Sequence, residues 1–459
     1  MPEVRSRFPI IALSALIFGH FLNHFYAYVL GASLFIVRKD INMTNAEIGL
    51  VGTAQIIVFA IFSVFVGIIG DRWLRSKNIF VPLGVLLMGV SLFIAAYSQN
   101  LQGLIWASIL TGFGASFYHP IAYASIADLF EEKKGLTMGF NTALGMIGTS
   151  ITPVLIVAFD SWIGWRRFFI VFGIIAVIIA LLLFILFHYM IEYKRTKEEE
   201  TEKINNKSLK REKQIKNWFK TELLVVLTVF VVICLFFSVF RTGIFRITNQ
   251  FLSIIFVDNY GFSIFQAGWI TTVILVIGGF TSIAGGMLSD KITTSLTMII
   301  SASGASIMLL LLVVLGQVIS GFGAIVLFFI FIAFLYFSAA ASTKYVAENV
   351  PQKSRSLALG FLFAIPNSIA GIFPWIFGLI LDTKTYHFGI TQQLSIIHGF
   401  VIKNVSHIWS FAFLLVLAVA ASILAFILFR RDWKLGKLKT LFDRRKRKRI
   451  PYIQYTDER

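Results

Sequence analysis

Residues 168–187 read FFIVFGIIAVIIALLLFILF, a run without a charged or hydrogen-bonding side chain. About 20 apolar residues in an α-helix cross the roughly 30 Å hydrocarbon core of a bilayer. Similar runs recur along all 459 residues, of which 57% are hydrophobic and only 14% are charged. Helices and closed barrels alone satisfy their backbone hydrogen bonds in lipid, and these runs lack the alternation of barrel strands. The sequence therefore predicts an all-α polytopic membrane protein.

The sequence indicates twelve transmembrane helices. The first run is too long for a signal peptide, so we interpret it as a retained helix. The expected spans cover residues 8–36, 45–70, 78–98, 101–128, 135–159, 163–190, 222–256, 264–289, 292–316, 320–348, 355–381 and 405–430. A charged cytoplasmic linker, residues 191–221, separates two six-helix bundles over residues 1–190 and 222–430. Residues 431–459 form a basic tail.

The basic residues indicate how the chain is oriented. The net charge of +18 would suggest nucleic acid on a soluble protein. Here most of the 41 Lys and Arg residues lie between spans on one side or in the tail. The positive-inside rule then places both termini in the cytoplasm, and we expect the plasma membrane and no nucleic-acid partner. We expect the tail to bind anionic lipid at about 1 kcal/mol per basic residue, with a cytosolic partner as the alternative.

The two bundles repeat each other. Residues 134–140 read KGLTMGF and residues 355–361 read RSLALGF, at an offset of 221. Further matches in chain order are Pro153 with Pro374, Gly67 with Gly286, Asp71 with Asp290, and Asp128 with Glu348. Such duplication is typical of transporters, in which the substrate site lies between the repeats near the midplane.

One motif resembles the loop 2–3 signature of the major facilitator superfamily. Gly67-Ile-Ile-Gly-Asp71-Arg72-Trp-Leu-Arg75 follows that signature, although Leu74 replaces its second glycine. Residues 286–291, GMLSDK, are a weaker copy at the matching place in the second half. The resemblance covers residues 8–430. It implies a secondary carrier that works by alternating access. We expect no cofactor and no catalytic residues, because no nucleophile, base and orienting group occur together, and we expect a monomer.

The resemblance also implies a latch between the halves that breaks on opening inward. Asp71 would meet the N-terminus of helix 11, and Asp290 the start of helix 5, since helix N-termini attract negative charge. Arg72 would pair with Asp128, and Lys291 with Glu348. The residues expected in this latch are Gly67, Asp71, Arg72, Arg75, Asp128, Gly286, Asp290, Lys291 and Glu348. A topology signal without a latch is the alternative.

The ionisable residues within the spans are basic. All 23 Asp and Glu residues lie in loops, in tails or near span ends. Intramembrane ionisable residues are functional candidates by default, and the resemblance implies that helices 1, 4, 7 and 10 line the cavity. The expected substrate-binding residues are His20, Asn23, His24, Tyr118, His119, Arg241, Arg246 and Asn249. A basic cavity suits a small anion such as a carboxylate, phosphate or sulfonate, which arginine binds with two parallel hydrogen bonds.

Spacing refines these expectations. His20, Asn23 and His24 share one helical face, whereas Arg241 and Arg246 are about 140° apart around their helix. The alternative interpretation of Arg246 is that its side chain snorkels to the outer mouth. The alternative interpretation of Lys344 is that it only pairs with Glu348. The histidines are candidates for carrying a coupled proton, because imidazole titrates near pH 6.5. We expect no metal site, since no acid lies near the pair.

Three functional alternatives remain open at this point. They are efflux of lipophilic drugs, uptake of a neutral nutrient such as a sugar, and a non-transporting receptor with the same fold. Helix 5 carries Gly139, Gly145, Gly148 and Pro153, in part like the antiporter signature of the superfamily, which predicts a closely packed helix. Residues 114–120, GASFYHP, weakly resemble phosphonate-antibiotic exporters of that superfamily.

Overall fold

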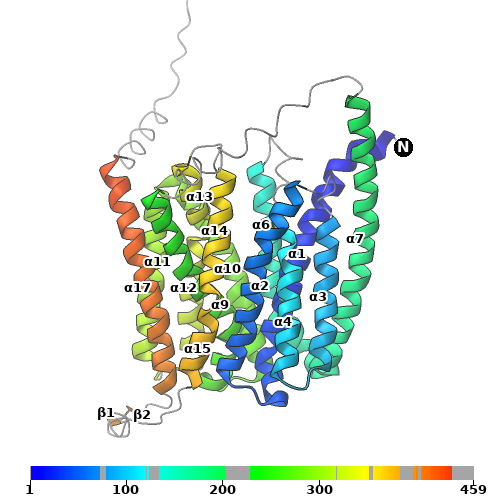
Figure 1. Cartoon of the computed structure of the whole chain (residues 1–459). Helices are drawn as coiled ribbons and strands as arrows, with labels where there is room; N and C mark the ends of the chain where they lie inside the picture. Colours follow the sequence, from blue (N-terminus) through cyan, green and yellow to red (C-terminus); the bar gives the residue numbers. More distant parts are fainter. Residues whose placement is uncertain are drawn as a thin grey trace, which may run out of the picture.

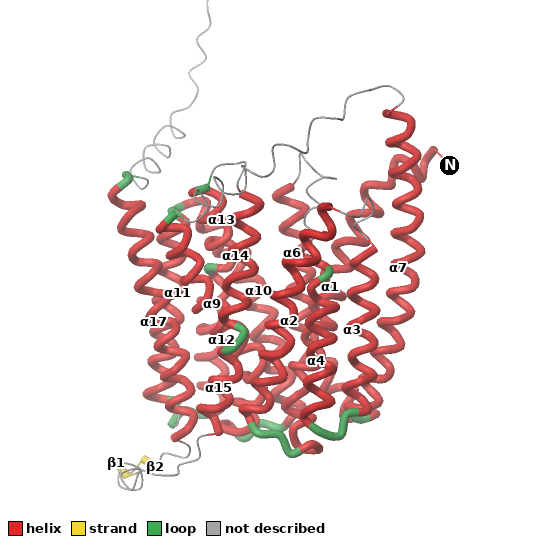
Figure 2. Tube along the Cα trace, viewed as in Figure 1, coloured by secondary structure: helices red, strands yellow, loops and turns green. Residues whose placement is uncertain are grey.

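The computed structural model shows a long helical bundle (Figures 1 and 2). It describes residues 2–72, 79–119, 121–122, 134–202, 228–316, 318–350, 355–382, 396–397, 400–401 and 405–436. The N-terminal half holds α1 (Pro2–Ile41), α2 (Asn45–Arg72), α3 (Phe80–Tyr97), α4 (Leu101–Ser116), α6 (Lys134–Ile163) and α7 (Trp165–Glu202). The C-terminal half holds α9 (Val229–Tyr260), α10 (Ile264–Lys291), α11 (Thr294–Leu315), α12 (Gly321–Phe337), α13 (Ala339–Asn349), α14 (Arg355–Ala370), α15 (Phe373–Asp382) and α17 (Val405–Lys434). Strands β1 (Ile396–Ile397) and β2 (Phe400–Val401) pair antiparallel between α15 and α17.

The helices confirm the predicted all-α membrane fold. Within the described residues, 11 helical stretches are long and apolar enough to cross a membrane. The stretch Trp165–His188 of α7 contains an 18-residue window with a mean hydropathy of 3.5, and its side chains Leu181, Leu182 and Ile185 are exposed. An apolar surface that covers the whole length of a helix is unfavourable in water, so lipid is its solvent. The fourth predicted span, residues 101–128, begins as α4, and its residues 120 and 123–128 lie outside the described part of the chain.

Two of the crossings are interrupted at equivalent places. Helix α4 ends with Phe117 as its C-cap residue, and α12 gives way to α13 at Ser338, so the two breaks are 221 residues apart. This separation equals the offset of the sequence repeat. Interrupted helices in transporters mark the midplane region where substrates bind. A third break, at residues 371–372 between α14 and α15, precedes Pro374, which has no N–H group to continue the helical hydrogen bonding.

The boundaries of the linker and tail differ from the prediction. Helix α7 runs to Glu202, so the first part of the predicted linker 191–221 is helical. Its Lys- and Glu-rich sequence has high helix propensity, which lets the helix continue beyond the membrane. Helix α9 begins at Val229 instead of residue 222, and α17 extends to Lys434. The rest of the linker and residues 437–459 of the basic tail lie outside the described residues.

The halves meet through two equivalent helix pairs. Helix α2 packs on α15, and α10 packs on α6. A Cβ atom at Gly49 would overlap the carbonyl oxygen of Pro374, and one at Gly268 would lie 3.1 Å from the carbonyl oxygen of Pro153. Since Pro153 and Pro374 are repeat partners, the two interfaces follow the same pseudo-symmetry as the sequence.

The two halves are joined at one end of the bundle. We call the end where α1 begins and α17 ends the terminal end, and the opposite one the far end (Figure 1). At the far end Arg38 donates to Asp258 at 2.5 and 2.9 Å. The Asp382 carboxylate accepts from the backbone N–H groups of Asn45 and Ala46, at 2.9 and 2.6 Å, and thereby caps α2.

These contacts define the conformational state. Gln250 adds a cross-half hydrogen bond to the carbonyl oxygen of Ile48, at 2.6 Å. The hydrogen bonds that Arg38, Asp382, Gln250, Arg246 and Thr272 make between the halves lie between the middle of the bundle and the far end. The structure is therefore closed at the far end, and the predicted orientation would make this the outer side.

Candidate substrate site

Arg246 lies at the interface between the two halves. Its Nη1 atom donates to the hydroxyl of Tyr28 on α1 at 3.0 Å, and its Nη2 atom donates to Oδ1 of Asn367 on α14 at 2.7 Å. Its Nε atom is buried and has no hydrogen-bond partner in the described part of the chain. Arginine carries five N–H donors, so the guanidinium keeps donors for a ligand. Snorkelling does not describe this position, because the head group is held between helices of both halves.

Three histidines of the N-terminal half lie beside Arg246. The ring centroids of His20 and His24 are 4.6 Å apart, and those of His20 and His119 are 5.2 Å apart. His24 stacks on Tyr28, with ring centroids 6.2 Å apart, which connects the cluster to the arginine. The charge of Arg246 acts on both His24 and His119. The three histidines predicted as site residues therefore lie together, next to Arg246.

Helix α6 positions the histidines. His20 Nδ1 lies 2.5 Å from the carbonyl oxygen of Asn141, and His24 Nδ1 lies 3.0 Å from Oγ1 of Thr149. Glycine permits this close approach, because a Cβ atom at Gly145 would lie 2.7 Å from the His20 ring. The glycine-rich pattern of this helix thus serves packing against α1, as small residues do between membrane helices.

Two of the predicted site residues, Tyr118 and Asn23, mainly support the structure, and Asn249 does so with its amide nitrogen only. Tyr118 stacks on His20 at 4.7 Å, and its hydroxyl lies 2.7 Å from the carbonyl oxygen of Leu16. Asn23 donates to the carbonyl oxygen of Ala115 at 3.1 Å and so ties α1 to α4. Asn249 donates to its own helix at 2.8 Å, and its Oδ1 atom is buried without a hydrogen-bond partner among the described residues. Asn249 therefore keeps a free acceptor near the interface.

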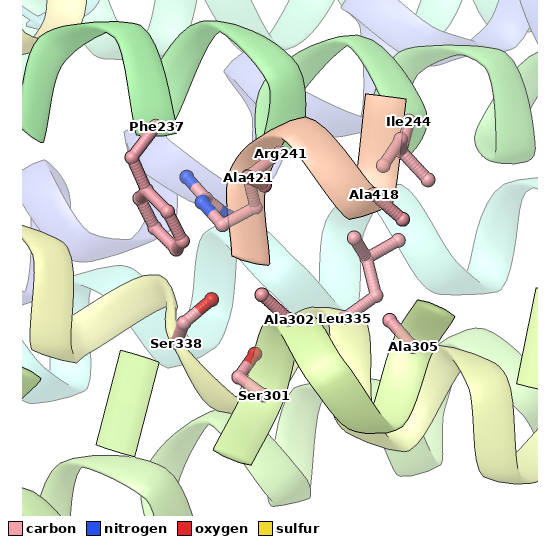
Figure 3. A pocket seen from close by; sticks show the side chains of 10 residues that line it. All are labelled: Phe237, Arg241, Ile244, Ser301, Ala302, Ala305, Leu335, Ser338, Ala418 and Ala421. Atoms are coloured by element: carbon pink, nitrogen blue, oxygen red, sulfur yellow. The ribbon is translucent and has the colours of Figure 1, made fainter. Parts of the chain in front are cut away.

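Arg241 occupies a different environment from Arg246. It borders a small pocket whose lining comes entirely from the C-terminal half, with Phe237 and Ser301 among its neighbours (Figure 3). Its Nε atom is buried and makes no hydrogen bond within the described residues. We expected Arg241 among the residues that line the central cavity, but the structure places it beside a pocket inside one bundle. The predicted angle between the two arginines explains why they face different surroundings.

The latch residues are described only in part. Gly67, Asp71 and Arg72 belong to α2, but their surroundings lie outside the described residues, as do Arg75 and Asp128 altogether. In the second half the Asp290 carboxylate contacts the ammonium of Lys344. Its expected partner, the start of helix 5, has side chains that lie outside the described residues. Lys344 Nζ also lies 3.8 Å from Glu348, which confirms that pairing. In a structure closed at the far end, this network stays within the C-terminal half.

The acidic residues leave the site positively charged. Every Asp or Glu whose side chain is described lies in the first or last turn of a helix. These residues are Asp40, Glu47, Asp160, Asp258, Asp290, Glu348, Asp382 and Asp432. No described carboxylate pairs with Arg246. The interface therefore offers a cation and hydrogen-bond donors without a built-in counter-ion.

Several site residues are missing from the sequence-based prediction. Tyr28 lies four residues after His24 on the same helical face, so spacing alone could have identified it. Asn367, Asn141 and Thr149 carry no such signal, because their role depends on which helices meet. The same holds for Asp382, which caps a helix of the other half.

Comparisons with known proteins agree with this architecture. The sequence profile of the Major Facilitator Superfamily matches residues 16–374 and again residues 232–454. A probable sulfoacetate transporter of Cupriavidus necator is 22% identical over 83% of this chain and 86% of its own length. The hexuronate transporter of Bacillus subtilis is 23% identical over 82% of this chain and 89% of its own length. A bacterial homolog of the human lysosomal transporter Spinster, solved in an inward-facing and occupied conformation, superposes with a TM-score of 0.72 at 16% identity, covering 92% of this chain and 97% of that one. Because the profile covers most of the sequence, this chain belongs to the Major Facilitator Superfamily, whose members are transporters and not enzymes.

Proposed function

We propose that this secondary transporter moves a small organic or phosphate-like anion across the membrane by alternating access. Arg246 would bind the anionic group between the two halves, with His24 and Asn249 beside it. The far end is closed in the structure, so the solute would enter or leave this site from the terminal end. Opening the far end would release the contacts of Arg38 and Asp382.

The observation that carries the proposal is the position of Arg246. Its guanidinium contacts one side chain from each half, and no described carboxylate neutralises it. A partly buried cation without a counter-ion loses hydration that no opposite charge repays, so the site favours a ligand that supplies the negative charge. Carboxylate, sulfonate and phosphonate oxygens match the planar donors of arginine. Because both halves contribute, such a ligand could stabilise one arrangement of the halves over the other.

The similar proteins support the substrate class. Sulfoacetate and hexuronate, which name two of the transporters reported above, are both small organic anions. The identities of 22% and 23% are too low to transfer either substrate. The two transporters support small organic anions as the substrate class, because the site residues of this chain carry the positive charge that such substrates require.

The remaining parts of the proposal concern coupling and topology. The His20, His24 and His119 cluster is the candidate carrier of a coupled proton, because an imidazole ring can take up and release a proton. The latch of Asp71, Arg72 and their repeat partners would close the terminal end when the far end opens. We further propose that both termini face the cytoplasm of the cell, in the plasma membrane, and that the basic tail binds anionic lipid.

A ligand-stabilisation screen tests the proposal directly. Purified protein in detergent is heated with small carboxylates, sulfonates, phosphonates, neutral sugars and cationic drugs. We expect anions alone to raise the unfolding midpoint. In the Arg246→Gln variant the loss of charged hydrogen bonds costs about 2 kcal/mol, which weakens binding roughly thirtyfold. Lys39→Gln, which removes an exposed cation at the far end, is the matched control and should bind normally.

The outcomes separate the alternatives. Stabilisation only by cationic or lipophilic drugs would contradict the anion proposal and favour efflux of such compounds. Stabilisation only by sugars would favour neutral nutrient uptake. Anion binding without flux in liposomes would favour a receptor. Normal anion binding by Arg246→Gln would show that the site lies elsewhere.

A further inference from the structure

We propose that His20, His24 and His119 form a binding site for a divalent first-row transition-metal ion. One ring nitrogen from each of the three side chains lies within 4.8 Å of the other two. Two of these residues lie one helical turn apart on α1, and the third comes from the segment that follows α4. The absence of a nearby acid led us to expect no metal from the sequence, but the third imidazole completes a set of three ligands.

The hydrogen bonds of the cluster prepare the imidazoles for metal binding. A carbonyl oxygen can only accept, so His20 Nδ1 must carry a proton toward Asn141. The hydroxyl of Thr149 has the carbonyl oxygen of Gly145 as its own acceptor, at 3.4 Å, which leaves its oxygen to accept from His24 Nδ1. In both neutral rings the lone pair then resides on Nε2. Metal-binding histidines show this pattern, with the second ring nitrogen donating to a carbonyl or hydroxyl oxygen.

The donor set selects the kind of ion. Zinc–nitrogen bonds of about 2.1 Å at tetrahedral angles place ligand nitrogens about 3.4 Å apart, so small side-chain rotations would close the cluster around an ion. Imidazole ligands suit Zn²⁺, Ni²⁺, Co²⁺ and Cu²⁺, whereas Mg²⁺ and Ca²⁺ require oxygen ligands. Three protein ligands leave one coordination position for water or for an anionic ligand.

The positive charge of Arg246 is the main force against a cation here. It acts on His24 and His119, so it weakens the attraction for a dication. A metal-bound anion would offset that charge and could contact the guanidinium at the same time. The metal site itself does not require the proposed transport function, because its ligands all belong to the N-terminal half.

Cobalt absorption tests this inference on the full-length protein. The protein is purified in detergent with an affinity tag that contains no histidine, and Co²⁺ is titrated while visible absorption is recorded. We expect the intense bands of four-coordinate Co²⁺, which one equivalent of Zn²⁺ should abolish. His119→Gln should weaken Co²⁺ binding at least tenfold. Thr149→Val, which removes the hydrogen bond to His24 and the longer one to the carbonyl oxygen of Gly145, should weaken it roughly tenfold.

Two control variants distinguish this site from cobalt binding elsewhere on the protein. His188→Gln, on an exposed part of α7, and Arg246→Gln should both retain the bands. The proposed function predicts that Arg246→Gln loses anion binding, whereas the metal site predicts that it keeps the cobalt bands. The two proposals can therefore fail independently. Absence of the bands in unsubstituted protein would overturn the inference. So would an unchanged Co²⁺ affinity in both His119→Gln and Thr149→Val, because the ion would then bind elsewhere.

Discussion

Replacing Asp382 should shift the equilibrium between the two states of the transporter. Its carboxylate accepts from two backbone N–H groups at the start of α2 and from the side-chain amide of Asn45 at 3.0 Å. These groups belong to opposite halves, so the contacts exist only while the far end is closed. Asp382→Ala therefore removes stabilisation from that state alone.

The magnitude follows from the kind of contact. Losing a capping side chain costs about 0.5–2 kcal/mol, and losing a negative charge at a helix N-terminus costs about 0.3–1 kcal/mol. A combined loss of about 2 kcal/mol changes the ratio of closed to open far ends roughly thirtyfold. The ion pair of Arg38 and Asp258 is more exposed, with 31% of the Asp258 side chain accessible. Exposed pairs contribute about 1 kcal/mol or less, so Asp258→Asn should change the ratio about fivefold or less.

Distance measurements between spin labels report this ratio. In a Cys234→Ala background, Lys39→Cys and Val318→Cys place labels on exposed far-end positions of the two halves. We expect Asp382→Ala to add a population at longer distance, Asp382→Asn to add less, and Asp258→Asn to add least. The reasoning is refuted if Asp382→Ala leaves the distances unchanged, or if Asp258→Asn has the larger effect.

Three further predictions use single substitutions. Gly145→Ala should lower the unfolding midpoint by an amount equivalent to about 1–3 kcal/mol, because its Cβ atom would lie 2.7 Å from the His20 ring. The control Gly360→Ala should leave the unfolding midpoint unchanged, because no atom lies within 4 Å of its Cβ position. Gly49→Ala should favour the open far end in the same label experiment, since its Cβ atom would overlap the Pro374 backbone, whereas Gly31→Ala has open space and should behave normally. Arg241→Met should leave anion binding unchanged and should not lower thermal stability, because it replaces a buried cation without a described hydrogen-bond partner by an apolar side chain; loss of anion binding would return Arg241 to the substrate site.

The sequence determined the architecture because membrane insertion depends on local composition. Each apolar run must become a helix, whatever its neighbours, since lipid cannot satisfy backbone hydrogen bonds. The internal repeat likewise predicted two similar halves, and the equivalent contacts at Gly49 and Gly268 follow that repeat. Residue type alone also singled out His20, His24, His119 and Arg246, because ionisable side chains are rare within spans.

The tertiary structure decided which of these side chains meet. Helix periodicity separates Arg241 from Arg246, but only the packing of α9 against its neighbours shows which arginine faces the other half. The partners of Arg246 come from positions 218 and 121 residues away, and Asp382 caps a helix 337 residues earlier. Such contacts follow from how complete helices pack, and a single sequence records no preference between the faces that could meet. The state of the transporter is likewise a property of the interface between two bundles, so no single segment of sequence encodes it.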